Sequence, residues 1–259
     1  MKIDLTGQSA VVIGGAKGIG AAIVRSFLDA GARVTALDMD NEALLVLSQE
    51  NGENLNTAVV DITDETALNE FASGEAVDHL ICAAAIGSGK PGFPFWKMKP
   101  RDWSKVIDVT LMGTVNALHA FVPALLEGDT QRKSVLILSS VAGQIGSQTD
   151  PPYSASKAAV INFAQCAAKD FAPYGVRVNA LSPGMVKTEL NESVFEANRK
   201  DSSSTYDDWA EEKIQKTSPL GRWQEPEEFG ATAVFLASEG GRNITGQTIN
   251  VDGGQVMHS

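Results

Sequence analysis

The chain has 259 residues, of which 43% are hydrophobic and 20% charged, so it is long enough to bury a core without a metal ion or disulfide bonds. Its formal net charge of −11 argues against nucleic acids and anionic membranes as main partners. Without a signal peptide or an apolar run of membrane-spanning length, we expect a cytoplasmic protein whose two cysteines, Cys82 and Cys166, are small buried residues.

Short apolar segments alternate with segments of helical periodicity along most of the chain. The predicted strands are residues 10–13, 33–37, 57–60, 79–82, 134–138, 176–181 and 247–251. Several are almost continuously apolar, which is typical of parallel strands covered on both faces. Between them, helical spacing places Ile19, Ile23 and Phe27 on one face. The alternation predicts an α/β protein: a single doubly wound, Rossmann-type domain over residues 1–259, with about seven parallel strands flanked by helices.

Two segments interrupt this pattern. Residues 87–99 are rich in glycine and proline and are not expected to form a regular element. Residues 187–220 form a polar, partly helical insertion with Phe195, Tyr206 and Trp209 as apolar anchors. Such an insertion is either a lid or binding loop, or a solvated surface excursion, and the sequence leaves both interpretations open.

A glycine-rich turn follows the first predicted strand and opens a helix. Gly14, Gly18 and Gly20 allow a tight turn and the close approach of a phosphate, which the free N–H groups of the helix would bind. Lys17 and Ile19 belong to the same turn. The spacing is Gly-x3-Gly-x-Gly instead of Gly-x-Gly-x-x-Gly, and a purely structural turn is the alternative. In its strand–turn–helix context the motif indicates a dinucleotide site.

Acidic residues follow the next two strands. Asp38 lies about 20 residues after the glycines, where a carboxylate can bind a ribose 2′-hydroxyl and repel a 2′-phosphate. Lys17 could instead pair with that phosphate, but no arginine follows Asp38, so we expect NAD in preference to NADP. Asp61, with Ile62 beside it, could contact the adenine, or it could cap a helix.

Tyr153 and Lys157 share one helix face because they are four residues apart. A nearby ammonium group favours the phenolate, and lowering the pKa of tyrosine from about 10 by about 3 units corresponds to roughly 4 kcal/mol. Tyr153 would then be a general acid/base near neutral pH, whereas an exposed helix pair is the alternative. Ser140 and the segment around Thr188 follow two other strands, so all three features are expected at the ligand-binding edge of the sheet.

In their order and spacing these motifs, with residues 179–184 and 246–254, resemble the short-chain dehydrogenase/reductase family over essentially the whole chain. The resemblance implies the compact form without a separate substrate domain. By resemblance Ser140 binds the substrate oxygen, Tyr153 exchanges its proton, and Lys157 binds the nicotinamide ribose. The other cofactor contacts it implies include Ala84, Pro183, Gly184, Val186 and Thr188.

The chain departs from the family pattern at three places. Ile13 replaces the threonine whose hydroxyl braces the glycine turn, and residues 82–85 read Cys-Ala-Ala-Ala instead of Asn-Asn-Ala-Gly. Thr110 replaces the asparagine of the catalytic tetrad. In the family, the main-chain carbonyl at that position holds a water that connects the lysine with solvent. Threonine keeps the carbonyl, but we expect it to lose the side chain that braces the local helix distortion. These changes are expected to affect turnover and cofactor affinity more than the type of reaction.

The sequence thus predicts an NAD-dependent oxidoreductase that interconverts a small polar secondary alcohol (a sugar, polyol or hydroxy acid) and its ketone. The alternative is an NAD-binding sensor or scaffold with little turnover, in view of Thr110 and residues 82–85. By resemblance, enoyl reductases space tyrosine and lysine more widely, and epimerases carry a larger C-terminal domain.

The remaining expectations concern surroundings and partners. The three histidines, His79, His119 and His258, are scattered, so no metal site is expected. The resemblance implies a homotetramer or homodimer. The substrate pocket is expected near Gln144, the 187–220 insertion and the 87–99 loop, where Phe93, Phe95, Trp96 and Trp103 either line it or pack at a junction. These segments show no clear clamp for an anionic substrate, and the cations in them are Lys90, Lys97, Lys187, Arg199 and Lys200.

Overall fold

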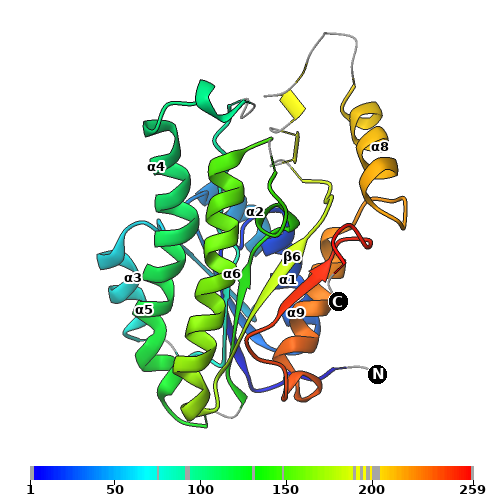
Figure 1. Ribbon diagram of the computed structural model, residues 1–259. Helices are drawn as coiled ribbons and strands as arrows, with labels where there is room; N and C mark the ends of the chain where they lie inside the picture. Colours follow the sequence, from blue (N-terminus) through cyan, green and yellow to red (C-terminus); the bar gives the residue numbers. More distant parts are fainter. Residues whose placement is uncertain are drawn as a thin grey trace.

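The protein folds around one seven-stranded sheet, in which every strand pairs in parallel (Figure 1). The computed structural model describes residues 3–257, except 75, 91–93, 130–131, 148, 189–190, 193–194, 197–198 and 200–204. The strands are β1 (Ser9–Ile13), β2 (Arg33–Asp38), β3 (Leu55–Val59), β4 (His79–Cys82), β5 (Ser134–Leu138), β6 (Arg177–Pro183) and β7 (Thr248–Val251). Each lies within two residues of its predicted segment, and the predicted fold class is confirmed.

Helices cover both faces of the sheet. They are α1 (Gly18–Asp29), α2 (Asn41–Asn51), α3 (Glu65–Ala72), α4 (Arg101–Ile107), α5 (Gly113–Leu126), α6 (Pro151–Phe171), α8 (Tyr206–Thr217) and α9 (Pro226–Ala237). Val11 and Ile13 of β1 pack into the core beneath α3, α5 and α6, whereas Ala10 and Val12 pack into the core with α1, α2 and α9. Burial on both faces explains the continuous apolar runs of the strands.

The order β3-β2-β1-β4-β5-β6-β7 reverses direction between β1 and β4. From β1 the chain moves outward to β3 and then returns to the other side of β1. The connections that leave β1 and β4 therefore diverge to opposite faces, and a crevice opens at the carboxyl ends of these strands. This topology places the glycine turn and the segments after β4, β5 and β6 around one space.

The helical stretch Arg101–Leu126, which comprises α4, a π-helical turn and α5, is long and apolar enough to cross a membrane by length and composition alone. However, half of its most apolar window is buried inside the protein. Phe121 and Leu125, for example, are fully buried in the core between the sheet and the helices α3, α5 and α6. Its apolar character therefore matches that of a helix packed in the core of a globular protein.

The structure also shows the surroundings of the histidine, cysteine and aromatic side chains named above. His79 is buried, its ring nitrogens lie 2.9 Å from Ser134 Oγ and 2.8 Å from Gln8 Oε1, and burial lowers its pKa to about 4, so it is a packed, neutral histidine. Cys82 is buried, but Cys166 is exposed on α6, so the second cysteine was assigned wrongly. Phe95 and Trp96 are 61% and 73% exposed, because the short helical turn that carries them projects from the surface. Neither lines the pocket, and Phe93 and His258 lie outside the described residues.

Candidate active site

A pocket of about 1550 Å³ extends along the carboxyl ends of the strands. It is lined by the glycine turn, the segments that follow β2 to β6, and one face of α8. It brings together these residues singled out in the sequence: Gly14, Lys17, Gly18, Ile19, Gly20, Asp38, Asp61, Ile62, Ala84, Ser140, Tyr153, Lys157, Pro183, Gly184, Val186 and Thr188. Thr110 and Gln144 do not line it.

The glycine turn packs too closely for side chains. Gly14 has φ +79°, and a Cβ there would lie 2.4 Å from the backbone nitrogen of Ala84. A Cβ on Gly20 would lie 1.9 Å from the carbonyl oxygen of Gly14. Although Ile13 lacks the family's hydroxyl, the carbonyl oxygen of Leu37 accepts hydrogen bonds from the Gly14 and Gly15 amides, at 2.7 and 3.2 Å. The turn is therefore braced by β2.

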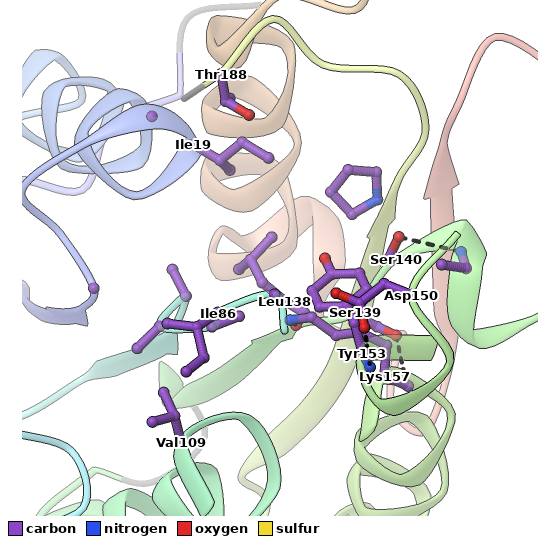
Figure 2. Close-up of a pocket in the computed structure, with 18 of the residues that line it drawn as sticks. Ile19, Ile86, Val109, Leu138, Ser139, Ser140, Asp150, Tyr153, Lys157 and Thr188 are labelled. Atoms are coloured by element: carbon purple, nitrogen blue, oxygen red, sulfur yellow. Dashed lines mark hydrogen bonds between the residues drawn. The ribbon is translucent and has the colours of Figure 1, made fainter. Parts of the chain in front are cut away.

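The start of α1 fits a dinucleotide phosphate. No side chain caps the helix at Lys17, so its first N–H groups remain available to an anion. Gly18 follows with φ +53°, and a Cβ there would touch the side chain of Thr188, 3.5 Å away. Figure 2 shows Ile19 and Thr188 together on one side of the pocket, across from Ser140, Tyr153 and Lys157. The pocket therefore fits a nicotinamide dinucleotide, with the start of α1 on one side to bind its phosphates and the proton-transfer residues on the other.

Asp38 lies between the glycine turn and α2. One carboxylate oxygen accepts from the Ala16 amide and the other from the Asp40 amide, both at 3.1 Å. Lys17, the competing candidate for a 2′-phosphate, forms an ion pair with Asp40 at 3.0 Å. Asp61 accepts from the backbone and side chain of Thr63, while α3 is capped by Asp64, so the alternative of Asp61 as a helix cap is wrong.

The proton-transfer groups converge at the start of α6. Ser140 follows β5, and Tyr153 and Lys157 occupy the first two turns of the helix (Figure 2). Lys157 donates through Nζ to the carbonyl oxygen of Leu138, and this nitrogen lies 5.6 Å from the Tyr153 ring centroid. The Ser139 hydroxyl donates to the Lys157 carbonyl oxygen at 2.8 Å. The end of β5 therefore fixes the helix that carries both groups.

The protonation state of Tyr153 differs from the sequence-based prediction. Burial raises the pKa of Tyr153 to about 12; a hydrogen bond with Ser140 opposes this rise and the charge of Asp150 adds to it. Burial also lowers the pKa of Lys157 to about 7. The prediction that the lysine ammonium lowers the pKa of Tyr153 is thus wrong. Burial removes water from both side chains, which disfavours the Tyr153 phenolate and the Lys157 ammonium alike.

Thr110 lies buried in the π-helical turn Asp108–Met112 between α4 and α5. The side chain at position 110 does not brace the helix distortion, as expected, yet the distortion is present without the family's asparagine. The Thr114 hydroxyl donates to the Thr110 carbonyl oxygen at 2.7 Å and supports the turn. The Thr110 hydroxyl itself is buried and has no hydrogen-bond partner among the described residues.

Asp150 is a site residue that the sequence reasoning missed. It is 8% exposed, and it accepts hydrogen bonds from the Ser88 amide at 2.7 Å and the Tyr153 amide at 3.4 Å. It thereby connects the loop after β4 to the first turn of α6. The available signal was an aspartate directly before Pro151 and Pro152, a typical N-cap followed by proline in the first turn.

Replacing Asp150 with asparagine is expected to shift the pH dependence of turnover toward lower pH. The asparagine oxygen can keep the shorter hydrogen bond from the Ser88 amide and loses the longer one from the Tyr153 amide, and the negative charge that raises the pKa of Tyr153 is gone. The Tyr153 phenolate then forms at lower pH, so the rising limb of the oxidation profile moves down. Steady-state rates across pH measure this. Asp64→Asn, which changes a helix cap on α3, is the matched control, and equal profiles for both variants would contradict the prediction.

The side chain of Gln144 has a structural role. Its side chain exchanges two hydrogen bonds with Asn250 of β7, at 2.8 and 2.9 Å, and this pair anchors the turn after Ser140. Gln144 itself does not line the pocket, because its amide is used in this pair, but its neighbours Val141, Ala142 and Ile145 do, which confirms that the pocket lies near Gln144.

The described part of the 187–220 insertion packs onto the protein. Phe195 lies 5.8 Å from Tyr206 and 5.6 Å from Trp209 between ring centroids, and Trp223 joins the cluster. The predicted anchors are confirmed. Lys213 and Thr217 of α8 line the pocket, which favours a binding wall over a solvated excursion. Lys200 and residues 201–204 lie outside the described residues.

The cations near the expected substrate pocket in sequence lie outside the pocket where the structure describes them. Lys90 pairs with Asp102, and Lys187 lies 3.9 Å from Asp207. Arg199 lies 3.6 Å from Glu196. None of these cations lines the pocket, nor does Lys97. In the described parts of the chain, no group of three or more His, Cys, Asp and Glu side chains could hold a metal ion.

Comparison with known proteins agrees with this geometry. A family model described as "Enoyl-(Acyl carrier protein) reductase" matches residues 14–256. The 3-oxoacyl-[acyl-carrier-protein] reductase of Thermotoga maritima is 33% identical over 262 residues, covering 98% of this chain and 99% of that protein. The chain belongs to the short-chain dehydrogenase/reductase family. Among its other relatives, the acetoacetyl-CoA reductase of Synechocystis is also 33% identical, with 98% of each chain covered.

Solved structures of the family superpose on the whole chain. A Brucella melitensis protein titled "Short-chain dehydrogenase/reductase SDR:Glucose/ribitol dehydrogenase" gives a TM-score of 0.87 at 26% identity, with 100% of both chains covered. Pseudomonas aeruginosa RhlG, solved as an NADP active-site complex, gives 0.83 at 26% identity, with 99% of both chains covered. As a member of the short-chain dehydrogenase/reductase family, the protein is an oxidoreductase that works with a nicotinamide cofactor.

Proposed function

We propose that the protein is an NAD-preferring dehydrogenase that interconverts a small polar secondary alcohol and its ketone. The observation that carries the proposal is the convergence of Ser140, Tyr153 and Lys157 in the same pocket as the glycine turn and Asp38. When bound, the nicotinamide ring supplies or accepts the hydride. The protein's own residues orient the substrate oxygen and exchange its proton.

Tyr153 is the proton-exchanging group of this proposal. Because its pKa is raised to about 12, it is protonated at neutral pH, which is the form that donates a proton to a carbonyl oxygen during reduction. In the oxidation direction Tyr153 must accept a proton, and any positive charge placed in the pocket favours its phenolate. Ser140, hydrogen-bonded to the Tyr153 side chain, is placed to contact the same substrate oxygen.

The names of the relatives supply a second candidate, a 3-oxoacyl thioester reductase. It uses the same proton donor and differs in substrate and physiological direction. Reduction of an enoyl double bond is less consistent with this chain, since Tyr153 and Lys157 are only one helical turn apart. A sensor with little turnover is disfavoured, because all three proton-transfer groups are retained in the pocket.

Assembly and location also belong to the proposal. We expect a homotetramer or homodimer in which α5 and α6 contact a second copy, and a cytoplasmic protein. Size-exclusion chromatography with light scattering tests the assembly.

The preference for NAD should depend on the charge of Asp38. In Asp38→Asn, the amide oxygen can still accept from the Ala16 amide beside the glycine turn, while the hydrogen bond from the Asp40 amide and the repulsion of a 2′-phosphate are lost. We expect the ratio of kcat/KM for NAD to that for NADP to fall at least about tenfold, which corresponds to about 1.4 kcal/mol.

Asp40→Asn is the control for this substitution, because it removes the neighbouring charge that binds Lys17. If the fall occurs in Asp40→Asn and not in Asp38→Asn, Lys17 controls the choice of cofactor. A wild-type enzyme that turns over only with NADP would refute the NAD preference and leave the proposed reaction standing.

A further inference from the structure

Helix α8 has one charged face and one packed face. Asp207, Asp208, Glu211, Glu212 and Lys216 are exposed on the outside. On the inside, Ala210 and Ile214 are buried, and Tyr206, Trp209 and Thr217 are half-buried. Lys213 is the one charged residue on this inner face, four residues after Trp209 and four before Thr217. A cation at a position that the helix otherwise fills with apolar groups needs an explanation.

In the part of the chain that the structure describes, the ammonium group of Lys213 has no counter-charge. Its Nζ lies 4.7 Å from the Trp209 ring centroid, and the residue lines the pocket. Among the described residues, no carboxylate lies within ion-pair distance of it, whereas Lys216 of the same helix pairs with Glu212. Desolvation lowers the pKa of Lys213. A partly buried charge is costly unless an opposite charge approaches it.

Helix α8 and the segment after β7 together form part of the pocket wall. Just past the helix, the Leu220 amide donates to the Gly253 carbonyl oxygen at 3.0 Å. In turn, Asn250 donates to the Val256 carbonyl oxygen at 3.2 Å and pairs with Gln144 in the turn that follows Ser140. These hydrogen bonds connect the wall that carries Lys213 to the turn that follows Ser140, and Figure 1 shows α8 on the opposite side of the molecule from α4 and α5.

A second polar group faces the same space. The side-chain oxygen of Gln255 is buried, has no hydrogen-bond partner among the described residues, and belongs to a residue that lines the pocket. Gln255 lies in the segment after β7 that packs against Leu220. An unpaired buried acceptor is costly, so this position favours a ligand that brings a hydroxyl or N–H donor.

We propose that Lys213 binds an anionic group of the substrate, a carboxylate or a phosphate, away from the reacting carbon, while Gln255 accepts a hydrogen bond from a substrate donor. The inference rests on the proposed function and narrows it. Among small polar alcohols and ketones, the site takes hydroxy acids, sugar acids or phosphorylated polyols in preference to their neutral counterparts. Lys213 is a specificity-determining residue, since it acts on binding and not on proton transfer.

The test compares substrates that differ only in charge. Acetoacetate is paired with acetoacetamide, and dihydroxyacetone phosphate with dihydroxyacetone. Wild type should prefer the anion of at least one pair, and the responding pair shows whether the group is a carboxylate or a phosphate. Lys213→Met, which retains most of the aliphatic stem over Trp209, should raise KM for that anion by about 10- to 100-fold with little change in kcat. The neutral partner should be unaffected, as should every substrate in the exposed control Lys216→Met.

Two outcomes overturn the inference while the proposed function survives. One is a wild-type enzyme that turns over the neutral members better than the anions. The other is a Lys213→Met variant that changes both members of a pair equally, because a general disturbance of the wall does not distinguish charge.

A binding measurement covers the case in which no pair is turned over. Tryptophan fluorescence is followed in the presence of NAD while acetoacetate or inorganic phosphate is added, since Lys213 lies over Trp209. A saturable change that persists in Lys216→Met and disappears in Lys213→Met supports the anion site, and a panel of other alcohols and ketones then tests the proposed reaction separately. A response that is absent, or equal in all three proteins, overturns the site.

Discussion

Replacing Tyr153 with phenylalanine is expected to lower kcat by about 10²- to 10⁴-fold while cofactor affinity stays within a few-fold of wild type. The substitution removes only the phenolic oxygen, which is the group that exchanges the substrate proton. The ring can still pack, because it is buried in the wall of the pocket. Lys157 keeps its hydrogen bond to the Leu138 carbonyl oxygen, so the cofactor side of the site is preserved.

The measurement is nicotinamide reduction or oxidation against a panel of sugars, polyols, hydroxy acids and 3-oxoacyl thioesters, with cofactor binding followed separately by fluorescence. Tyr174→Phe is the matched control, because it makes the same change at an exposed tyrosine outside the pocket. If Tyr153→Phe retained turnover comparable to Tyr174→Phe, the assignment of Tyr153 as general acid/base would be wrong.

The second large effect is expected from Gly14→Ala. A left-handed backbone costs about 1–2 kcal/mol for a residue with a side chain, and an overpacked contact adds about 1–3 kcal/mol. At Gly14 both costs apply, since the new methyl group would lie 2.4 Å from the Ala84 nitrogen. We expect a loss of roughly 2–5 kcal/mol in the free energy of unfolding, together with a large loss of cofactor affinity.

Urea unfolding and cofactor titration measure these losses. Gly7→Ala is the matched control, because Gly7 has φ +83° but nothing within 4 Å of an added Cβ. It reports the backbone cost alone, and the difference between the two variants is the cost of the contact with Ala84. Equal destabilisation of both variants would show that the turn relaxes freely and that β1 and β4 are not locked together there.

The fold was predictable from the sequence because burial on both faces leaves a direct signal. Val11 and Val12 of β1 enter different cores, so the strand reads as continuously apolar. The positions of the glycine turn and of the Tyr153–Lys157 pair were also predictable, since both depend on local spacing. Cys166 was not, because a small apolar side chain reads alike on either face of α6.

The electrostatics of the site depend on depth, which the sequence does not encode. Spacing alone predicted that Lys157 would lower the pKa of Tyr153, whereas burial raises it to about 12. Lys213 was missed for a related reason. The role of Lys213 depends on which face of α8 packs inward. Phe195 and Trp223, which lie outside the helix, determine that face by packing against its aromatic side chains.

The carboxylate of Asp38 has two roles, one in cofactor choice and one in supporting the backbone. It stands where the adenosine ribose is expected, and it also holds the amides of Ala16 and Asp40 in place. Redesign of this enzyme for a different cofactor therefore cannot treat the end of β2 as an independent module. A small or basic residue at this position removes the repulsion of a 2′-phosphate and loosens the loop that must receive the pyrophosphate. A successful redesign needs a compensating acceptor for these amides, so the new specificity has to be introduced together with a new support.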